Sequence, residues 1–522
     1  MSPMIKPVHI PILLLGLLST ALHAQGPPIE WQVSLGGSLL DIGHAVRQTA
    51  QGEYLIVGET NSMDGDVTNN LGSVDGWWIR LGSDGTLLDQ HTYGGSGDDR
   101  FNTLVATSDG GSLLVGATNS TDGDVSGLHG IARDIWVAKV NTLGVLQWQR
   151  TLGGIANDDA YSAIQVSDGG FVIWGAANSF DGDVTGHHGL GTMADFWVVK
   201  LDNSGELIWE HSYGGTSNDR GYCIMPTADG GFIMAGQTFS SDGEVTGQHG
   251  QNDAWLVKMD SAGNLEWQRA CGGSSEDIAN AVLQLPDGGY VVAGSTSSTN
   301  GDVSNSHGAL DAWVVRLDGT GAILWQRALG GSGSDAFNAM DLDVDGGLIL
   351  AGQTTSNNGN VGQLHGAQDA WVVKLDLNGA ILWQKTMGGI LSDAFMDIIT
   401  TSDGGHILTG RSASADGDVT ANAGSDDVWV VRLASQVGIH EHGAEVLTIW
   451  PNPSQGRIHF PSARIAQGKR RLVLSDAKGR FINERTLLPG IDEADLGRQA
   501  PGVYFLSLYT ESSVRRGQLV ME

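Results

Sequence analysis

A Gly-Gly pair recurs seven times along the chain at a nearly constant interval, and this repeat constrains the fold more than any other feature. Successive pairs are separated by 58 to 61 residues. They begin at Gly36, Gly94, Gly153, Gly214, Gly272, Gly330 and Gly388. A fixed period of this length is typical of repeat architectures, in which each unit buries its core against its neighbours.

Two further landmarks keep the same period. A loop motif related to Asp-Gly-Asp-Val begins at Asp64, Asp122, Asp181, Asp242, Asn300, Asn358 and Asp416. An Asp also lies two residues before a Trp in every unit, at Asp75, Asp134, Asp195, Asp253, Asp311, Asp369 and Asp427. Three landmarks therefore agree on seven units.

Each unit reads as four short strands separated by turns. In the sixth unit the strand-like segments are AFNAMDLDV, LILAGQT, AWVVKLD and AILWQKTM, and turn-forming Gly, Asp and Asn lie between them. Seven of the 16 Trp follow the recurring Asp and six lie in the fourth strand, where they suit packing between units. Four-stranded units repeated without helices predict an all-β fold, a seven-bladed β-propeller over residues 25–433.

The two ends of this region complement each other. The segment IEWQVSLGG near the N-terminus matches the fourth strand of a unit, such as ILWQRALGG at Ile323, whereas the seventh unit stops after its third strand, VWVVRL. We therefore expect the N-terminal strand to complete the last blade and close the ring by sheet hydrogen bonds.

Residues 1–24 have the pattern of a secretory signal peptide. Lys6 precedes an apolar stretch over residues 10–18, and small residues follow at Ala21 and Ala24. The apolar stretch is too short to cross a bilayer, and no later segment is long and apolar enough. We expect export to the periplasm, followed by secretion or display at the outer-membrane surface, with no transmembrane segment.

Charge separates two regions of the chain. Residues 25–433 contain 16 Lys and Arg against 50 Asp and Glu, a net charge of −34, whereas residues 434–522 contain 11 against 9, a net charge of +2. So acidic a first region repels nucleic acid and anionic lipid, and no nucleic-acid partner is expected. Cys223 and Cys271 are the two cysteines, and we expect both to be free, buried thiols.

The seven units resemble a known repeat family over residues 30–433. The pattern is Gly-Gly-x-x-x-Asp, then Asp-Gly-Gly followed by a strand and Gly-x-Thr-x-Ser, then a strand ending in Lys-Leu-Asp with a Gly after it. This pattern resembles the bacterial seven-bladed β-propeller repeat family. The resemblance implies the fold and leaves the ligand open.

The last 75 or so residues have a different character. They alternate as a small Ig-like β-sandwich does, and their motif residues are Pro451, Asn452, Pro453, Gly456, Asp476, Gly479, Gly502, Val503 and Tyr504. These motifs resemble the C-terminal sorting domain of the type IX secretion system of Bacteroidetes. The resemblance implies a linker over residues 434–446 and a sorting domain over residues 447–522 that engages the type IX machinery.

The Asp-Gly-Asp-Val loop is the candidate metal site. In the first unit Asp64, Asp66 and Asp75 have positions 1, 3 and 12 of a calcium-type loop, and the seventh unit repeats this spacing with Asp416, Asp418 and Asp427. The Gly and the closing Glu of a standard calcium loop are missing, and Asp is also common in tight turns. Calcium binding and a purely structural turn both fit.

The sequence contains no recognisable catalytic motif, and the units read as nearly uniform. His129, His188, His249, His307 and His365 each precede a Gly in the long loop, where loop hydrogen bonding explains them better than metal binding. No nucleophile elbow, zinc motif or phosphate-binding loop is present. We therefore expect a non-enzymatic surface protein that binds a protein or glycan ligand and carries no catalytic residues or firm cofactor. The alternative is an extracellular hydrolase or lyase acting on polysaccharide.

Overall fold

The computed structural model divides into two compact units, residues 1–435 and 436–522. It describes residues 24–189 and 193–435 of the first unit. In the second unit it describes residues 449–450, 452, 454, 456–459, 470–476, 481–488, 493–497, 499–509 and 514–521. The predicted signal peptide and linker lie outside the described residues, except for Ala24, Ala434 and Ser435.

The first unit is built of β-strands. Its first two sheets contain β3 (Asp41–Gln48), β4 (Tyr54–Thr60), β5 (Asp75–Leu81), β6 (Leu87–Tyr93), β7 (Asp99–Ala106), β8 (Ser112–Thr118), β9 (Asp134–Val140) and β10 (Leu146–Leu152). The next two contain β11 (Asp158–Gln165), β12 (Phe171–Ala177), β13 (Asp195–Leu201), β14 (Leu207–Tyr213), β15 (Asp219–Pro226), β16 (Phe232–Thr238), β17 (Asp253–Met259) and β18 (Leu265–Cys271). The rest contain β19 (Asp277–Gln284), β20 (Tyr290–Thr296), β21 (Asp311–Leu317), β22 (Ile323–Leu329), β23 (Asp335–Leu342), β24 (Leu348–Thr354), β25 (Asp369–Leu375), β26 (Ile381–Met387), β27 (Asp393–Thr400), β28 (His406–Ser412) and β29 (Asp427–Leu433).

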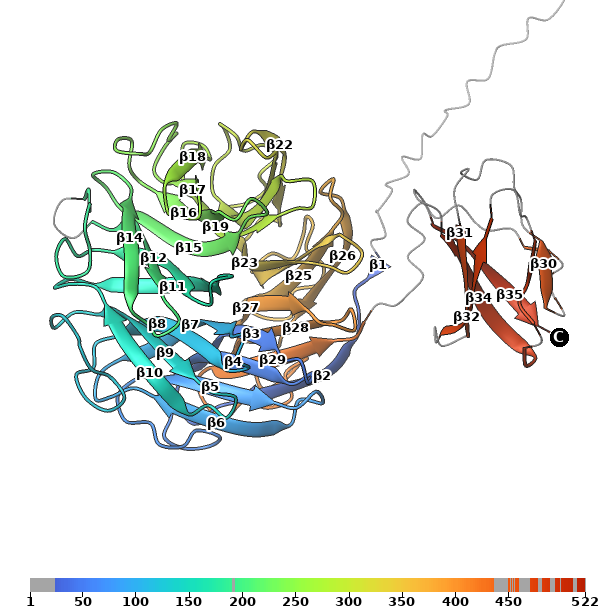
Figure 1. Ribbon diagram of the computed structural model, residues 1–522, viewed down its shortest axis with the longest axis horizontal. Helices are drawn as coiled ribbons and strands as arrows, with labels where there is room; N and C mark the ends of the chain where they lie inside the picture. Colours follow the sequence, from blue (N-terminus) through green and yellow to red (C-terminus); the bar gives the residue numbers. More distant parts are fainter. Residues whose placement is uncertain are drawn as a thin grey trace, which may run out of the picture. The chain divides into compact units, whose positions relative to one another are not determined.

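These strands form repeated antiparallel sheets of four successive strands, so the predicted all-β repeat is confirmed. The N-terminal segment supplies the fourth strand of the last sheet and adds a fifth strand to the sixth sheet. The first strand of each sheet lies nearest the common centre (Figure 1). Each of these inner strands contacts the inner strand of the next sheet, and β27 contacts β3. The arrangement has a β-propeller repeat architecture, and the described residues contain no helix that is long and apolar enough to cross a membrane.

The sheets pack face to face through their middle strands. β25 is buried at all seven positions, because the faces of its sheet are covered by the neighbouring sheets. Trp371 of β25 stacks on Phe337 at 5.2 Å between ring centroids, and both belong to a core shared by the fifth and sixth sheets. The tryptophans that follow the recurring Asp are all at most 1% exposed, as their packing role requires.

Every inner strand contains a β-bulge at the same place. In β3 the ladder with β4 skips from Gly43 to Ala45, so His44 has no partner across the ladder. The other six inner strands skip the equivalent residue. A bulge redirects the side chain of its extra residue, so seven side chains around the centre are freed from the regular ladder.

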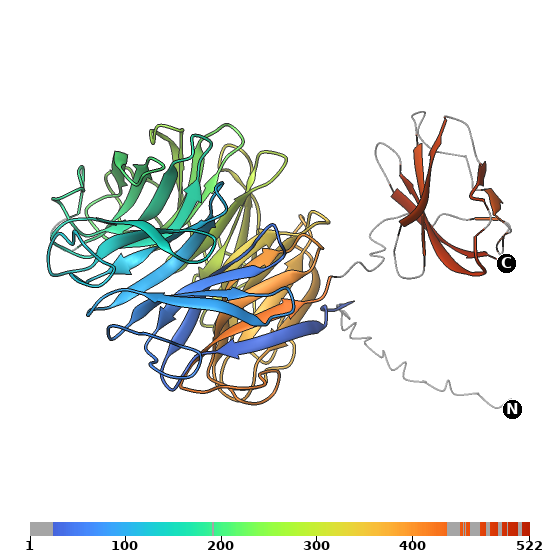
Figure 2. The same cartoon turned by 60° about the horizontal axis from the view of Figure 1, so that its bottom comes forward.

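The N-terminal segment joins the last sheet. β2 (Ile29–Leu35) pairs antiparallel with β29, and the indole of Trp429 donates to Gln32 Oε1 at 2.6 Å. Figure 2 shows this strand in blue beside the orange strands of the last sheet. The short β1 (Ala24–Gln25) pairs parallel with β26 in the sixth sheet.

The last sheet also contacts the first sheet directly. The backbone N–H of Asp41 donates to the carbonyl of Asp426 at 2.8 Å. Arg47 makes an ion pair with Asp397 at 2.6 Å. The two sheets that hold the ends of the seven units are therefore neighbours.

The second unit contains two sheets around one core. Its strands are β30 (Arg457–His459), β31 (Arg470–Asp476), β32 (Phe481–Leu487), β33 (Glu493–Asp495), β34 (Gly502–Tyr509) and β35 (Val514–Met521). β30 pairs with β33, and the other four form a sheet in the order β32-β31-β34-β35. Ile458 and Ala494 of the small sheet share a hydrophobic core with Leu506 of the large one. Asn452 of the predicted sorting motif accepts a hydrogen bond from the N–H of Val520 at 2.8 Å, whereas Pro451, Pro453 and Gly479 lie outside the described residues.

Candidate functional site at the inner strands

The bulge residue has a structural role in three of the seven units. Asn102, Asn280 and Asn338 occupy this position, and each donates its side-chain N–H to a backbone carbonyl of the next inner strand. The donor–acceptor distances are 2.7 to 2.9 Å. Asn at this position therefore ties one sheet to the next.

The other four units lack this side-chain hydrogen bond to the next inner strand. Their bulge residues are His44, Tyr161, Tyr222 and Met396, and all four side chains are half-buried. Tyr161 and Tyr222 belong to adjacent sheets and meet edge to face, with ring centroids 5.5 Å apart. A repeat fold has no structural need for these exceptions, which makes the position a candidate for function.

Charged residues gather at the second position of the same inner strands. Arg100 of β7 is half-buried and Arg220 of β15 is exposed, and neither makes an ion pair with any described residue. Asp159 of β11, between them, is held by Arg133 at 3.1 Å. We call His44, Arg100, Asp159, Tyr161, Arg220 and Tyr222 the inner cluster.

Burial and charge tune the inner cluster. The pKa of Tyr161 is raised to about 12, mainly by burial and in smaller part by Asp159, while Arg220 and Arg100 oppose the rise. Burial lowers the pKa of His44; Glu59 opposes this shift, and Arg100 adds to it. Nε2 of His44 is buried without a hydrogen-bond partner. The cluster thus offers two unpaired guanidinium groups, two phenol rings and a neutral imidazole, a set suited to binding an anionic or polar ligand.

Near-uniformity of the seven units was therefore a wrong expectation for the inner strands. The second and third strands keep their pattern because they build the shared core, whereas the fourth residue of the first strand is half-buried in every unit and the second residue ranges from buried to exposed. The signal was available in the sequence: aligning the units on their Gly-Gly pairs leaves these two columns with mixed charge and mixed size. No motif marks them.

The predicted calcium loops place their carboxylates on backbone N–H groups. Asp64 accepts from Ser38 at 2.7 Å, and Asp66 accepts from Gly36 at 3.2 Å, so both hold the Gly-Gly turn of their own unit. Asp416 and Asp418 bind Ile390 and Gly388 in the same manner in the seventh unit. These bonds are what a structural turn requires.

Asp75 and Asp427 lie apart from these turn contacts, at the starts of β5 and β29. Both are at most 2% exposed, and burial raises the pKa of each to about 6. Asp75 Oδ2 accepts from the N–H of Leu71 at 2.6 Å, and Asp427 Oδ2 accepts from that of Ala423 at 2.7 Å. Oδ1 of each is buried without a hydrogen-bond partner.

Each of these two carboxylates faces another one across a sheet junction. A Cβ added to Gly94 would lie 2.7 Å from Asp75 Oδ1 and 2.5 Å from Asp99 Oδ2. The same holds at Gly36 for Asp427 and Asp41. Within the described ranges, no three His, Cys, Asp or Glu side chains form a group that could hold a metal ion. Calcium binding at these loops stays a prediction.

The loop histidines pair with the buried Asp of their own unit. The Nδ1 atoms of His129 and His249 lie 2.6 Å from Oδ2 of Asp134 and Asp253, and the backbone N–H of each His donates to the same carboxylate. The rings of His188 and His365 bind Asp195 and Asp369 in the same way, so the predicted hydrogen bonding is found at four of the five loop histidines. Nδ1 of His307 lies 3.9 Å from Asp311, and only the backbone N–H of His307 donates to that carboxylate. Both cysteines are free, as predicted, and Cys271 is buried, whereas Cys223 is only half-buried and not buried as expected.

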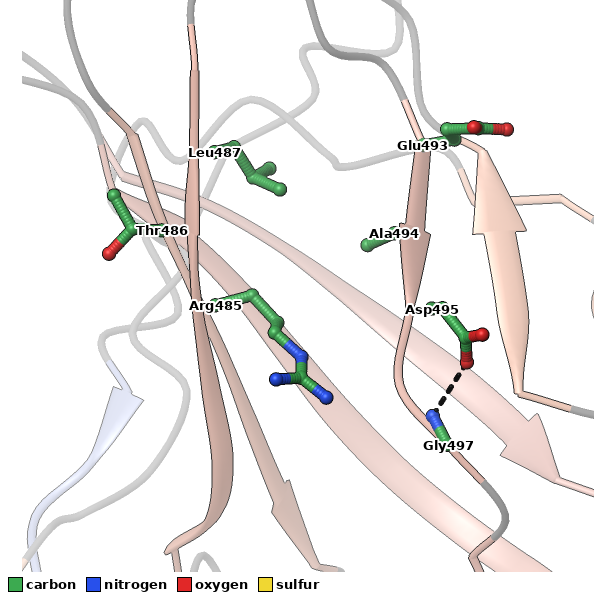
Figure 3. A pocket seen from close by; sticks show the side chains of 7 residues that line it. All are labelled: Arg485, Thr486, Leu487, Glu493, Ala494, Asp495 and Gly497. Atoms are coloured by element: carbon green, nitrogen blue, oxygen red, sulfur yellow. Dashed lines mark hydrogen bonds between the residues drawn. The ribbon is translucent and has the colours of Figure 1, made fainter.

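Two cavities lie away from the inner cluster. One of about 300 Å³ is lined by Ser126, Gly127, His129, Gln149, Arg150, Thr151 and Asp183 in the first unit. The other, of about 470 Å³, opens between β32 and β33 of the second unit, where Arg485 extends between the two strands and Gly497 donates to Asp495 (Figure 3). Both are lined by groups of opposite charge.

The chain shows limited sequence similarity to known proteins. No family model matches the chain. The regulatory protein FlaEY of Caulobacter vibrioides is 29% identical over 201 residues, which are 35% of this chain and 21% of that protein, so the match spans about a fifth of the relative.

Solved structures with a similar fold have low sequence identity. The extracellular domain of a hybrid two-component system protein of Bacteroides thetaiotaomicron is 11% identical, with a TM-score of 0.40 over 92% of this chain and 56% of that chain. Sqt1 of Chaetomium thermophilum is 14% identical, with a TM-score of 0.40 over 82% of this chain and 97% of its own.

Proposed function

We propose that this chain is a secreted or cell-surface binding protein whose seven four-stranded sheets are the blades of a closed β-propeller. The pairing of β2 with β29 and the bonds between the first and last sheets support closure by the N-terminal strand. The ring presents its inner cluster to a protein or glycan ligand. The observation that carries the proposal is the pair Arg100 and Arg220, which make no ion pair with any described residue in a unit with a large excess of carboxylates.

Substitution of the two tyrosines tests the site. We expect Tyr161→Ala with Tyr222→Ala to weaken ligand binding by at least about tenfold, because half-buried aromatic rings supply much of the contact area in such sites. The measurement is binding of the full mature chain to a glycan array and to extracellular proteins. Phe180→Ala, an aromatic that is 62% exposed on a loop of the same sheet as Tyr161, is the matched control. If the tyrosine variant and the control bind equally well, the ligand does not bind at the inner cluster.

A polysaccharide hydrolase or lyase is the second candidate, because Tyr, His and Arg side chains meet in the inner cluster. Binding is favoured over catalysis by the state of the candidate groups. With a pKa of about 12, the phenol of Tyr161 stays protonated at neutral pH and is unavailable as a general base, and Asp159 is held in an ion pair with Arg133. Release of reducing ends or unsaturated sugars from a bound polysaccharide would decide for the enzyme.

We further propose that residues 447–522 direct export through the type IX secretion machinery of a Bacteroidetes cell. The motif residues named above support this assignment, and the second unit has its own core, as a separable address domain requires. Deleting residues 447–522 is expected to leave the first unit folded but retained in the periplasm, measured by fractionation of the native host. Unchanged appearance of the truncated chain in the medium would contradict this route.

A further inference from the structure

We propose that the inner cluster recognises the carboxylate of an acidic sugar at the end of a glycan chain. This inference rests on the proposed function, since it names the ligand class of the same site. Its basis is the combination of two tyrosine rings with two guanidinium groups that make no ion pair among the described residues, all on the inner strands β7, β11 and β15.

The guanidinium groups set the charge of the ligand. Arg47, Arg133 and Arg411 all contact carboxylates within the unit, at 2.6 to 3.1 Å, whereas Arg100 and Arg220 contact none among the described residues. They occupy the same position of β7 and β15, the inner strands that lie on either side of β11 and its Tyr161. Arginine pairs with carboxylates through two parallel hydrogen bonds, which gives the ligand both charge and orientation.

The negative charge of the surrounding protein surface determines which position of the carboxylate within the ligand is favourable. The first unit has an excess of acidic residues all around its repeated loops, and a polyanion lying along that surface would be repelled. A ligand with its charge at one end reaches the arginines without crossing the acidic surface. A terminal acidic residue meets this condition better than a chain of repeating acids.

The remaining groups favour a sugar over a peptide. The rings of Tyr161 and Tyr222 provide apolar surface for the C–H face of a sugar ring, and both are half-buried. Gln237 Nε2 donates to the Tyr222 hydroxyl at 2.8 Å, and Asn252 Nδ2 donates to Gln237 Oε1 at 2.7 Å. These bonds hold the Tyr222 ring in place, so the two rings form a fixed surface for the C–H face of a sugar ring, which a peptide terminus lacks.

The test compares matched ligands on the full mature chain. The probes are oligosaccharides ending in a hexuronic acid, the same oligosaccharides with that carboxyl reduced to an alcohol, and short peptides with a free or amidated C-terminus. Calorimetry is expected to give a Kd at least about tenfold lower for the acid-ended sugar than for its reduced form, and this difference should shrink in high salt because exposed charges are screened.

Arginine variants complete the test. Arg100→Met and Arg220→Met should each weaken binding of the acid-ended sugar by about tenfold with no change in melting temperature, because neither residue makes an ion pair. Arg327→Met, on the outer strand β22 where the guanidinium lies 5.8 Å from the Trp325 ring, is the control and should bind as the native chain does.

Each of the other possible outcomes overturns a specific part of the proposal. Equal affinity for the acid and its reduced form, or absence of binding by every acid-ended sugar, overturns the ligand class. Tighter binding of the free peptide terminus overturns the choice of a sugar. If the arginine variants and the Tyr161→Ala, Tyr222→Ala variant all bind a glycan normally, the inner cluster is not the site and the proposed function fails with it.

Discussion

A chain that begins at Gly36 is expected to lose most of its cooperative folding, whereas a chain that begins at Gly26 keeps it. The first deletion removes β2 and leaves β29 as an open edge without its six-residue ladder. It also removes Leu35, which is 4% exposed in a core shared with the first sheet, and the Gln32 partner of the Trp429 indole. Net hydrogen bonding and apolar burial together make this loss on the order of 5–10 kcal/mol, comparable with the whole stability of a domain.

Thermal unfolding followed by circular dichroism measures this effect. Starting at Gly26 removes β1 alone, so that chain is the matched control for loss of the terminal pairing. A synthetic peptide covering residues 26–37 should restore part of the lost stability when added to the shorter chain. If the chains starting at Gly36 and Gly26 melt at the same temperature, β2 does not hold the last sheet.

The first unit is also expected to become more stable as the pH falls from about 7.5 to about 5. Burial raises the pKa of Asp158 and of Asp219 to about 6. Below about pH 4 these carboxyls are protonated in the folded and unfolded chain alike. As the pH rises towards 6 the unfolded chain loses these protons first, so the free energy of unfolding falls, by roughly 1–3 kcal/mol per carboxyl.

Two histidines oppose this trend. Burial lowers the pKa of His406 to about 4 and also lowers that of His44, so protonation of the unfolded chain below about pH 6.5 costs stability. The raised carboxyls outnumber them, because Asp99, Asp134, Asp253, Asp277 and Asp311 are raised by burial as well. We expect a melting temperature roughly 2–5 °C higher at pH 5 than at pH 7.5.

Calorimetry at several pH values provides the measurement. The variant Asp158→Asn with Asp219→Asn should show a smaller dependence on pH than the native chain, whatever its absolute stability. A melting temperature that falls on acidification would contradict the assignment. Millimolar calcium added at pH 7.5 tests the predicted loops in the same experiment, because an ion held by Asp75 or Asp427 raises the melting temperature and the double variant Asp75→Asn with Asp427→Asn removes that rise.

The sequence predicts the fold well because the same physical requirements recur in each unit. A middle strand such as β25 has to be apolar on both faces, and the turns have to contain Gly with positive φ, as at Gly346 and Gly379. Seven repetitions of one pattern average out local ambiguity. The strands, their order and the partner of β2 could all be anticipated on this basis.

The candidate site could not be predicted in this way. His44, Tyr161 and Tyr222 lie at a bulge that backbone pairing creates. Their column varies among the aligned units, but no residue type or motif identifies the bulge in the sequence. Arg100 and Arg220 stand out because they lack carboxylate partners, which is a property of the folded chain. In the calcium loops, by contrast, residue spacing alone suggested ligands, and the folded chain uses Asp64 and Asp66 to hold turns.

The pairing of β2 with β29 also sets an order of events in time. Gln32 and Trp429 are 397 positions apart. During synthesis, β2 can therefore pair with β29 only after the end of the seventh unit has been made. Closing so long a loop is slow and entropically costly, and it comes after the local hairpins have formed. The fold of the first unit is therefore completed only after the whole unit has been synthesised, and the nascent chain stays incompletely folded until then.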